Sequence, residues 1–358
     1  MRIGVPREQK DHEKRVGITP DGVHSLVELG HTLVIERGAG VGSGFQDADY
    51  TAAGAQLGSA ADAWACDLVV KVKEPIPSEY GFLRNDLTLF CYLHLAAEPE
   101  LAQALMDAGT TAIAFETVTD AHGGLPLLTP MSEIAGRLSV QIGAYLLTNP
   151  AGGPGVLLGG IGGVAPIHVT VVGGGTSGAQ AVDVAVGLGA QVTVIDINTS
   201  TLRRFMERYQ NRVHCVSSSP AAIAEALSRS HLVIGSVLVP GAKAPIVISK
   251  EHIQAMPQGA VIVDIAIDQG GCTELSKPTS HSEPTYVADH VTMYCVTNMP
   301  GSAQVTATKA LAAETLPFVR QLAELGTEEA IAANPHLAAG VNIRRGEILH
   351  QGVRQALC

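Results

Sequence analysis

The sequence predicts an α/β protein made of two Rossmann-like, doubly wound domains with a cleft between them. Short apolar runs alternate with helix-like patterns along the whole chain, which is typical of parallel sheets covered by helices on both faces. A glycine-rich segment near residue 175 separates one such run from a helix. With 358 residues, 46% of them apolar, the chain can bury two separate cores.

The first 130 residues carry five apolar runs that we predict as strands. Two helices are predicted between them, and each begins with a proline and is followed by a glycine. These helices are Pro20–Leu29 and Pro99–Ala108. The predicted strands are Arg2–Val5, Thr32–Ile35, Leu68–Val72, Leu87–Tyr92 and Thr111–Phe115.

The middle of the chain alternates most regularly, in the order expected of a doubly wound nucleotide-binding sheet. The predicted strands are His168–Val172, Gln191–Ile195, Val213–Val216, His231–Ile234 and Val261–Asp264. The predicted helices are Ser177–Leu188, Thr199–Tyr209 and Pro220–Ser228.

The C-terminal part predicts helices again, over Ala310–Leu325 and Gly346–Ala356. No third sheet is predicted for these helices to cover, so we expect the chain to return to the first domain. A long helix over residues 132–148 and the segment near residue 300 are the expected crossings that join the two domains.

Charge and composition argue against several classes of partner. Lys and Arg number 23 against 34 acidic residues, and the formal net charge of −11 disfavours binding to nucleic acid or to an anionic membrane. Residues 138–182 lack charged side chains, but repeated glycine and proline argue against a membrane-spanning helix. The charged, proline-containing N-terminus is unlike a signal peptide.

Cysteine usage and ligand spacing give two further expectations. The six cysteines lie far apart and form no C-x-x-C pair, which favours reduced thiols and a cytoplasmic location. No group of oxygen or nitrogen ligands has metal-binding spacing, so we expect no metal.

A dinucleotide-binding fingerprint, G-x-G-x-x-G, follows the predicted strand His168–Val172 and opens a predicted helix. Gly173 would make the tight turn, Gly175 would let the backbone approach a pyrophosphate, and Gly178 would let the helix pack on the strand. Backbone N–H groups at the helix N-terminus would then face the phosphate charge. An ordinary turn is the alternative interpretation.

An acidic residue ends the next strand, as this fingerprint requires. Asp196 lies eighteen residues beyond Gly178. Its carboxylate would accept hydrogen bonds from the ribose hydroxyls and repel a 2′-phosphate, so NAD is favoured over NADP. A helix cap is the alternative role for Asp196.

Four other polar residues are candidates for a substrate site. Lys73, His94 and Asp268 each follow a predicted strand, and open α/β sheets bind ligands at the carboxyl ends of their strands. Arg15 stands in a charged cluster before a helix, where its guanidinium could bind a carboxylate with two hydrogen bonds. The alternatives are a solvated lysine, a hydrogen-bonded core histidine, a turn aspartate and a surface ion pair.

Several segments together resemble the family of alanine dehydrogenases and of the nucleotide-binding subunits of proton-translocating transhydrogenases. The resemblance covers residues 1 to about 320, in order. The segments are Gly4–Glu8, Arg15–Pro20, Val70–Pro75, Tyr92–Leu95, Leu127–Ser132, Gly173–Gly178, Val261–Gly271 and Asn298–Gly301.

The resemblance implies an enzyme that converts L-alanine and NAD to pyruvate, ammonium and NADH, and that catalyses the reverse reaction. Arg15 and Lys73 would bind the substrate carboxylate and keto oxygen, and His94 and Asp268 would be the catalytic pair. Either member of that pair could move the proton, and we favour His94 as the acid/base with Asp268 orienting water. Residues that look like pocket walls are Glu8, Tyr92 and Met131.

By the same resemblance, residues 1–129 and 306–358 would form the substrate domain and residues 130–305 the NAD-binding domain. Family members are commonly hexamers, so a homo-oligomer is expected. Beside the glycines, the positions that match an NAD site are Ser132, Thr176, Ser177, Asp196, Ser218, Val237, Leu238, Ile265, Ala266, Asn298 and Met299.

Two other functions stay open at this level. A transhydrogenase subunit would bind NAD(H) but would be accompanied by membrane segments or a partner subunit. A non-catalytic NAD-sensing module would need the glycine fingerprint but neither Lys73 nor His94.

Overall fold

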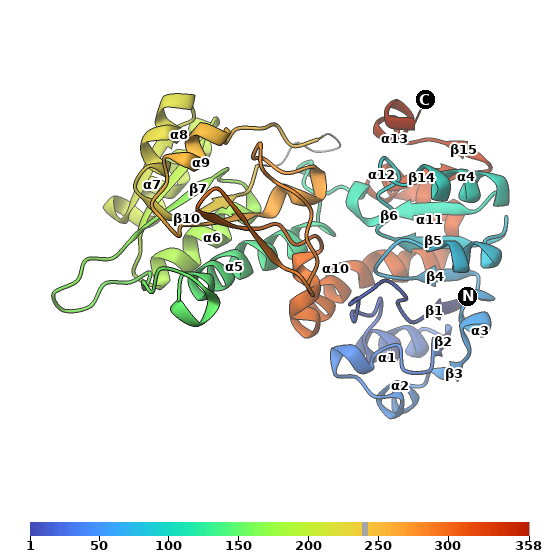
Figure 1. The fold of residues 1–358 in the computed structure, drawn as a ribbon. Helices are drawn as coiled ribbons and strands as arrows, with labels where there is room; N and C mark the ends of the chain where they lie inside the picture. Colours follow the sequence, from blue (N-terminus) through green and yellow to red (C-terminus); the bar gives the residue numbers. More distant parts are fainter. Residues whose placement is uncertain (238–242, 358) are drawn as a thin grey trace. The chain divides into compact units, whose positions relative to one another are not determined.

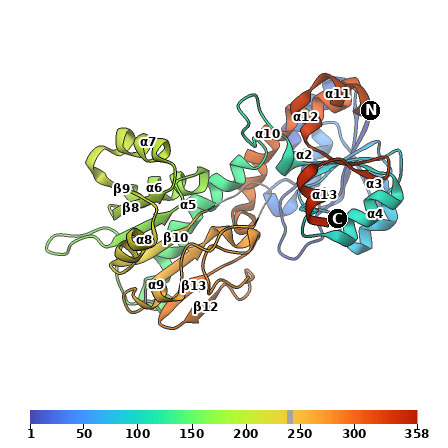
Figure 2. The same ribbon diagram turned by 90° about the horizontal axis from the view of Figure 1, so that it is seen from above.

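The structure is a computed structural model that describes residues 1–237 and 243–357 (Figures 1 and 2). The chain forms two compact units. Unit 1 consists of Met1–Met131 and Ala303–Cys358, and unit 2 of Ser132–Ser302. The first boundary falls within helix α5 (Thr129–Leu146), and the second falls within the 3-10 helix η7 (Met299–Ala303).

Among the described residues, unit 1 contains one eight-stranded sheet in the order β15-β14-β6-β5-β4-β1-β2-β3. Strands β1 to β6 are parallel, and β14 and β15 extend the sheet as antiparallel strands. The parallel part has the order 3-2-1-4-5-6, which is that of the Rossmann fold. The strands are β1 (Arg2–Val5), β2 (Thr32–Glu36), β3 (Gln56–Gly58), β4 (Leu68–Val70), β5 (Thr88–Cys91), β6 (Thr111–Ala114), β14 (Val341–Arg344) and β15 (Glu347–Ile348).

The helices of unit 1 begin and end as their sequences suggest. Thr19 caps α1 by accepting a hydrogen bond from the N–H of Gly22, and Gly109 ends α4 with a left-handed φ of 69°. The helices are α1 (Pro20–Glu28), α2 (Asp47–Ala52), α3 (Ala60–Trp64), α4 (Pro99–Ala108), α10 (Gln304–Leu325), α11 (Thr327–Ala333), α12 (Pro335–Ala339) and α13 (Gln351–Leu357).

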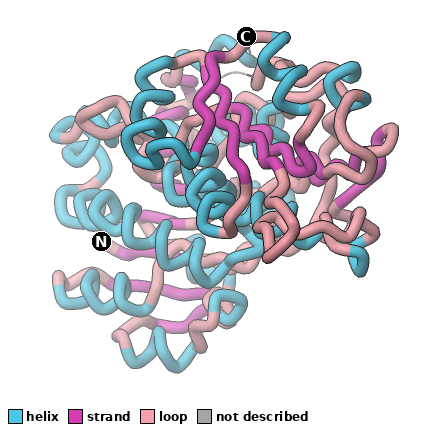
Figure 3. Tube along the Cα trace, turned by 90° about the vertical axis from the view of Figure 1, so that its left-hand side faces the viewer, coloured by secondary structure: helices cyan, strands magenta, loops and turns pink. Residues whose placement is uncertain are grey.

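Unit 2 repeats the same parallel order. Its described strands form a sheet in the order β12-β13-β11-β10-β7-β8-β9, in which only β12 is antiparallel. Strands are magenta in Figure 3, which is turned by 90° from Figure 1. The strands are β7 (His168–Val172), β8 (Gln191–Asp196), β9 (Val213–Ser217), β10 (Ser230–Gly235), β11 (Val261–Asp264), β12 (Thr285–Ala288) and β13 (Val291–Tyr294). The helices, besides α5, are α6 (Thr176–Gly187), α7 (Thr199–Tyr209), α8 (Pro220–Leu227) and α9 (Lys250–Gln254).

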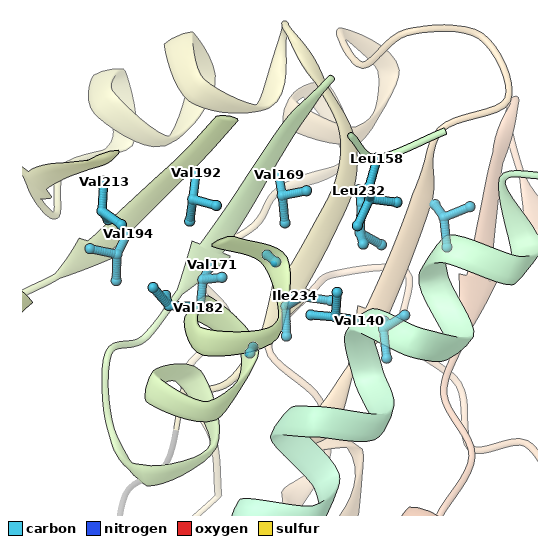
Figure 4. Packing of buried hydrophobic residues seen from close by; sticks show 14 of the residues in the cluster. Val140, Leu158, Val169, Val171, Val182, Val192, Val194, Val213, Leu232 and Ile234 are labelled. Atoms are coloured by element: carbon cyan, nitrogen blue, oxygen red, sulfur yellow. The ribbon is translucent and has the colours of Figure 1, made fainter. Parts of the chain in front are cut away.

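Both faces of the unit 2 sheet are largely buried, because successive strand residues point to opposite faces and most of them are apolar. Val171 packs in one cluster and its neighbour Val172 in the other. The first cluster includes Val140 from α5 and Val182 from α6, which lie over the strands in Figure 4. The second includes side chains from α8 and α9.

Each sheet has a point where the strand order reverses. In unit 1 it lies between β1 and β4, and in unit 2 between β7 and β10. Loops that leave neighbouring strands at this point run in opposite directions, so the carboxyl edge of the sheet has room for a ligand there. Glu8 follows β1, Lys73 follows β4, and the glycine fingerprint follows β7.

The structure confirms most predicted elements and corrects others. The predicted helix over Gly346–Ala356 is wrong in its first half, where β14 and β15 form a hairpin. Arg345 and Gly346 make its two-residue turn with φ values of 52° and 77°, and two positive φ values are typical of hairpin turns. The strand predicted over Leu68–Val72 ends at Val70. Sequence patterns missed a set of short elements of two to seven residues each, namely α2, β3, α3, α9, β12, β13, α11, α12, β14 and β15.

No helix among the described residues combines the length and apolar character that crossing a membrane requires. The uncharged residues 138–182 instead supply half of α5, a glycine-rich loop, β7 and about half of α6.

Candidate active site

The candidate residues of unit 1 lie beyond the carboxyl ends of neighbouring parallel strands. Glu8 follows β1, Lys73 follows β4, and His94 follows β5. The order β5-β4-β1 in the sheet brings these three segments to one edge. The reversal point of the strand order lies between two of them, β1 and β4.

Glu8 connects two of these strand ends. Its carboxylate accepts hydrogen bonds from the backbone N–H of Val72 at 2.6 Å and of Lys73 at 3.4 Å. Burial raises the pKa of Glu8 to about 7, although the nearby Lys71 ammonium opposes the shift. Because both oxygens bind the backbone, Glu8 holds the segment that carries Lys73.

Lys71 lies buried beneath this edge. Its ammonium is 2.7 Å from a carboxylate oxygen of Glu79, 3.6 Å from one of Glu8, and 5.7 Å from the centre of the Trp64 ring. The pKa of Lys71 is raised, because the charges of the two carboxylates outweigh the opposing effect of burial. One ammonium therefore faces two carboxylates, and the charge of Glu79 adds to the rise in the pKa of Glu8.

Arg15 is only 2% exposed, and Glu13 binds it with two hydrogen bonds. The guanidinium donates from Nε at 2.7 Å and from Nη2 at 2.5 Å to the two oxygens of Glu13. Nη1 lies 3.1 Å from the sulfur of Met131. The bidentate edge that was expected to bind a substrate carboxylate is thus engaged by Glu13, and Met131 contacts Arg15 directly.

His94 faces a buried carboxylate. Its Nδ1 lies 3.2 Å from one oxygen of Glu74, whose other oxygen contacts the Lys10 ammonium. The His94 side chain is 39% exposed and the Glu74 side chain 5%. Burial would lower the pKa of His94, but the hydrogen bond to Glu74 and the charge of Glu116 raise it above its ordinary value.

The backbone of His94 is held in an unusual conformation. Its φ is +49°, in the left-handed region that is uncommon for residues other than glycine. Glu116, which follows β6, accepts hydrogen bonds from the N–H of His94 at 2.7 Å and of Leu93 at 3.2 Å. The imidazole stacks on Tyr92, whose hydroxyl donates to the carbonyl of Leu127 at 2.6 Å. These contacts define where the imidazole lies.

Lys73 is half-buried, and its ammonium makes no hydrogen bond or ion pair with another residue in the described part of the chain. Its charge acts on both Glu74 and His94. A cation so placed is available to an anionic or carbonyl ligand.

In unit 2 the glycine fingerprint forms the loop between β7 and α6. Gly173 has a φ of 99°, and a Cβ there would lie 2.6 Å from the Ser236 carbonyl oxygen. A Cβ on Gly178 would lie 1.9 Å from the carbonyl oxygen of Gly173. A Cβ on Gly175 would meet nothing within 4 Å, and no side chain caps α6. The loop is closed on its inner side and leaves N–H donors at Thr176 and Ser177 for a ligand.

Asp196 ends β8 beside this loop. Its carboxylate accepts hydrogen bonds from the N–H of Gly174 at 2.6 Å and of Asn198 at 2.7 Å. The N–H of Ser218, after β9, donates to the Asp196 carbonyl at 3.0 Å. The structure thus brings the fingerprint, Asp196 and Ser218 together at one edge of the sheet.

The loop after β11 is organised by a buried acid. Asp264 accepts hydrogen bonds from the N–H of Ala266 at 3.0 Å and of Cys272 at 2.9 Å, and from the Ser276 hydroxyl at 2.5 Å. Ile265 is half-buried and Ala266 buried. Val237 follows β10 and is half-buried, whereas Leu238 lies outside the described residues.

Asp268 is exposed and contacts another candidate. One carboxylate oxygen accepts a hydrogen bond from the N–H of Asn298 at 3.2 Å, and Asn298 has a φ of +56°. The next residue, Met299, is buried. The predicted catalytic pair therefore divides between the units, with His94 in unit 1 and Asp268 in unit 2.

Ser132 is the first residue of unit 2 and lies half-buried in α5. One turn further along α5, a Cβ on Gly136 would lie 2.1 Å from the carbonyl oxygen of Ser177. This close approach places the first turns of α5 against the N-terminus of α6.

Sequence reasoning assigned no role to three acids that the structure makes important. Glu13 binds Arg15, Glu74 binds His94, and Glu116 holds the backbone of His94. Glu74 and Glu116 follow β4 and β6, so the strand-end rule could have selected them. No sequence pattern predicts that Glu13 binds Arg15, although only one residue separates them.

Within the described residues, no three His, Cys, Asp or Glu side chains are grouped as a metal site would require.

The sequence matches known domains over almost its whole length. Residues 4–135 match the domain described as alanine dehydrogenase/PNT, N-terminal, and residues 139–351 match the C-terminal domain of the same description. An alanine dehydrogenase from Halomonas elongata is 51% identical over 358 residues, covering 99% of this chain and 96% of that protein. One from Mycobacterium tuberculosis is 51% identical over 355 residues with the same coverage.

Solved structures give the same picture. A structure named L-alanine dehydrogenase has a TM-score of 0.96 and 51% identity, and the match covers 99% of both chains. A transhydrogenase from Sinorhizobium meliloti has a TM-score of 0.84 and 25% identity, covering 98% of this chain and 99% of that one. Because both domains match in order and half of the residues are shared with full-length relatives, the chain belongs to the alanine dehydrogenase/PNT family.

Proposed function

We propose that this chain is an NAD-dependent L-alanine dehydrogenase, which interconverts L-alanine with pyruvate and ammonium. The observation that carries the proposal is the group of side chains at the strand ends of unit 1. There the half-exposed imidazole of His94 faces the buried Glu74, and the charge of the Lys73 ammonium acts on both. The full-length relatives that bear the name alanine dehydrogenase support the same reaction.

NAD is the proposed cofactor, and residues 130–305 are the proposed NAD-binding domain. The inner face of the glycine loop has no room for a side chain, and the uncapped start of α6 offers N–H donors to a pyrophosphate. Bound there, NAD supplies the acceptor for the hydride that leaves Cα of alanine. Residues proposed to complete the site are Ser132, Thr176, Ser177, Asp196, Ser218, Val237, Leu238, Ile265, Ala266, Asn298 and Met299.

The proposed substrate site belongs to residues 1–129 and 306–358. Arg15 and Lys73 would bind the carboxylate and the keto oxygen, with Glu8, Tyr92 and Met131 around them. Since Nε and Nη2 of Arg15 already bind Glu13, the carboxylate would meet the guanidinium from the side of Nη1. An apolar pocket separates a methyl group only weakly from slightly larger groups, so some activity on 2-aminobutyrate or serine is expected.

The chemistry requires proton transfers as well as the hydride. Once Cα has lost its hydride, water adds to the imine carbon, and His94 would take the proton that the water loses. His94 would then return that proton to the nitrogen. As the C–N bond breaks, the hydroxyl oxygen becomes the keto oxygen, and its proton leaves with the ammonia as ammonium, so the imidazole is again neutral. Asp268 would orient the water and offset the positive imine. This assignment gives one catalytic group to each unit.

A homo-oligomer, and by family resemblance a hexamer, is also proposed. Leu157, Ile161 and Val164 are 61–65% exposed in the glycine-rich loop between α5 and β7, which projects away from the sheet of unit 2 in both views (Figures 1 and 2). Exposed apolar groups on such a projecting loop are suited to subunit contacts. Light scattering after gel filtration would give the mass, and a monomer at micromolar concentration would contradict the proposal.

The likeness to the S. meliloti transhydrogenase favours one alternative, an NAD(H)-binding subunit that passes hydride between two nucleotides. Such a subunit would have no use for a cation and an acid/base paired at the edge of unit 1. An NAD sensor without catalysis would likewise not depend on Lys73 and His94.

Absorbance of NADH distinguishes these functions. Purified protein given L-alanine and NAD should form NADH, and pyruvate, ammonium and NADH should lose it. Replacing His94 by Ala should abolish turnover while NADH still binds, because the acid/base is lost and unit 2 is unchanged. Absence of turnover in both directions would refute the dehydrogenase assignment.

A further inference from the structure

A chain of three charged side chains leads from the surface of unit 1 to the imidazole of His94. The Lys10 ammonium contacts Oε1 of Glu74, and Oε2 of Glu74 lies 3.2 Å from Nδ1 of His94. Lys10 comes from the loop after β1, Glu74 from the end of β4, and His94 from the loop after β5. Three neighbouring strands of the sheet thus each contribute one member.

We propose that Glu74 is the positioning residue for His94 and that Lys10 sets how much negative charge Glu74 presents to the imidazole. Glu74 holds the ring with a proton on Nδ1, so that Nε2 is the nitrogen that exchanges a proton with water or substrate. The inference rests on the proposed function only in taking His94 as the acid/base.

The protonation states follow from the contacts. Burial would raise the pKa of Glu74, but the hydrogen bond and charge of His94, the charge of Lys73 and the hydrogen bond from Lys10 lower it well below its ordinary value. An ionised carboxylate only accepts hydrogen bonds, so Nδ1 must be the donor. The neutral imidazole then has its lone pair on Nε2, as in catalytic histidines that are oriented by a carboxylate.

The ring has few other ways to turn. Glu116 holds the His94 backbone N–H at 2.7 Å in the left-handed conformation, and the ring stacks on Tyr92. The charged groups that face the imidazole are Glu74 and Lys73 after β4 and Glu116 after β6, with Lys10 behind Glu74. Only Glu74 contacts a ring nitrogen among the described residues, so it alone selects the tautomer.

Lys10 is placed to moderate this effect. Its side chain is 32% exposed and it also lies 3.9 Å from a carboxylate oxygen of Glu98. Removing the Lys10 cation leaves Glu74 more negative toward His94 and should stabilise the imidazolium. Removing the Glu74 charge should do the reverse. A pair that merely holds the loops together would give no such opposite effects.

Four variants test this in the full-length protein. Glu74→Gln keeps an acceptor for Nδ1–H but loses the charge, Glu74→Ala loses both, and Lys10→Met removes the cation. Asp107→Asn is the matched control, since Asp107 is an exposed acid of α4 whose side chain binds only Gln103 within the described part of the chain. Thermal melts check that each variant folds.

Imidazole NMR of the protein without ligands measures the pKa and tautomer of His94 directly, with its signals assigned by their loss in His94→Asn. Glu74→Gln should lower the pKa of His94 by about one unit, because an adjacent anion is lost. Lys10→Met should raise it by roughly a few tenths, and added salt should reduce that change. Glu74→Ala should lose the Nδ1–H tautomer, which Glu74→Gln keeps. Asp107→Asn should match the wild type.

Turnover provides the second readout. The low-pH limb of kcat/KM for alanine oxidation, where His94 must be unprotonated, should move to lower pH in Glu74→Gln and to higher pH in Lys10→Met. An unchanged His94 pKa in Glu74→Gln, or shifts of the same sign in Glu74→Gln and Lys10→Met, would overturn the inference. If the wild-type protein did not turn over alanine, the proposed function would be refuted, while the NMR result would still test the role of Glu74.

Discussion

The carboxylate of Asp196 lies 2.6 Å from the backbone nitrogen of Gly174 and accepts its hydrogen bond. The acid that is proposed to select NAD is therefore tied to the glycine loop that is proposed to hold the pyrophosphate. Its second oxygen accepts from the N–H of Asn198, at the start of α7. The position of the carboxylate is thus defined before any nucleotide binds.

This relationship gives the first prediction. Asp196→Asn keeps an oxygen that can accept from Gly174 but removes the charge that repels a 2′-phosphate. NADPH should therefore gain affinity relative to NADH, whereas Asp196→Ala should in addition weaken NADH binding by freeing the loop. Fluorescence titrations with both nucleotides measure the ratio of dissociation constants. The same ratio in wild type and Asp196→Asn would contradict the role of the charge.

The glycines of α6 give the second prediction. Gly178→Ala places a Cβ 1.9 Å from the carbonyl oxygen of Gly173, so the loop must move, and affinity for NADH should fall by about tenfold or more. Gly187→Ala in the same helix meets nothing within 4 Å and should leave affinity unchanged. Equal NADH affinity in the two variants would show that loop geometry does not govern binding.

The third prediction concerns Glu8 and the pH dependence of stability. The pKa of Glu8 is raised to about 7 from 4.5, so between these values the folded state holds more protons than the unfolded state. Stability due to this group is therefore full below pH 4.5, declines as pH rises, and is lost above pH 7. Glu8→Gln should remove this decline, a relative gain of at most about 3 kcal/mol at pH 8 compared with pH 5.

Thermal melts at pH 5 and pH 8 measure this difference. Glu100→Gln, which changes an exposed acid of α4, should shift the melting temperature equally at both pH values. If Glu8→Gln also shifted the melting temperature equally at pH 5 and pH 8, burial of the Glu8 charge would not destabilise the folded state.

The fourth prediction concerns two histidines at the amino ends of strands in unit 2. Burial lowers the pKa of His168 and of His231, and Nδ1 of each is a buried atom with no hydrogen-bond partner among the described residues. The unfolded chain therefore binds protons more readily, so unit 2 should lose stability as pH falls below about 6.5.

Hydrogen exchange followed by mass spectrometry would localise this loss to β7 and β10. Replacing both His168 and His231 by Gln should move the acid transition of unit 2 to lower pH. His24→Gln, at an exposed position of α1 in unit 1, is the control and should leave the transition in place. The prediction would be contradicted if faster exchange began at the same pH in the wild type, the double variant and His24→Gln.

Much of the fold was accessible from sequence patterns for a physical reason. The parallel strands of unit 2 are apolar on both faces, so runs such as His168–Val172 stand out from their surroundings and their bounds were predicted correctly. The hairpin of β14 and β15 was not, because β15 has only two residues and its turn is made by Arg345, which has no special turn preference.

The candidate site divides in the same way. Lys73, His94 and Asp268 were selected because polar residues follow buried strands, and Asp196 because it follows a glycine fingerprint. The partners of these residues come from other loops. Glu74 could pair with His94 only after β4 and β5 had been placed side by side, and the register of a sheet is set by packing rather than by local sequence.

The sequence by itself determined that the chain is an α/β protein with a glycine fingerprint and charged residues at its strand ends, since strand period and glycine geometry are local properties. Only the tertiary structure decided which charges neutralise one another. Arg15 binds Glu13, Lys71 binds Glu79, and Glu74 binds both Lys10 and His94. A charge buried at a sheet edge must find a partner wherever the fold supplies one, and that choice depends on distances that no sequence pattern records.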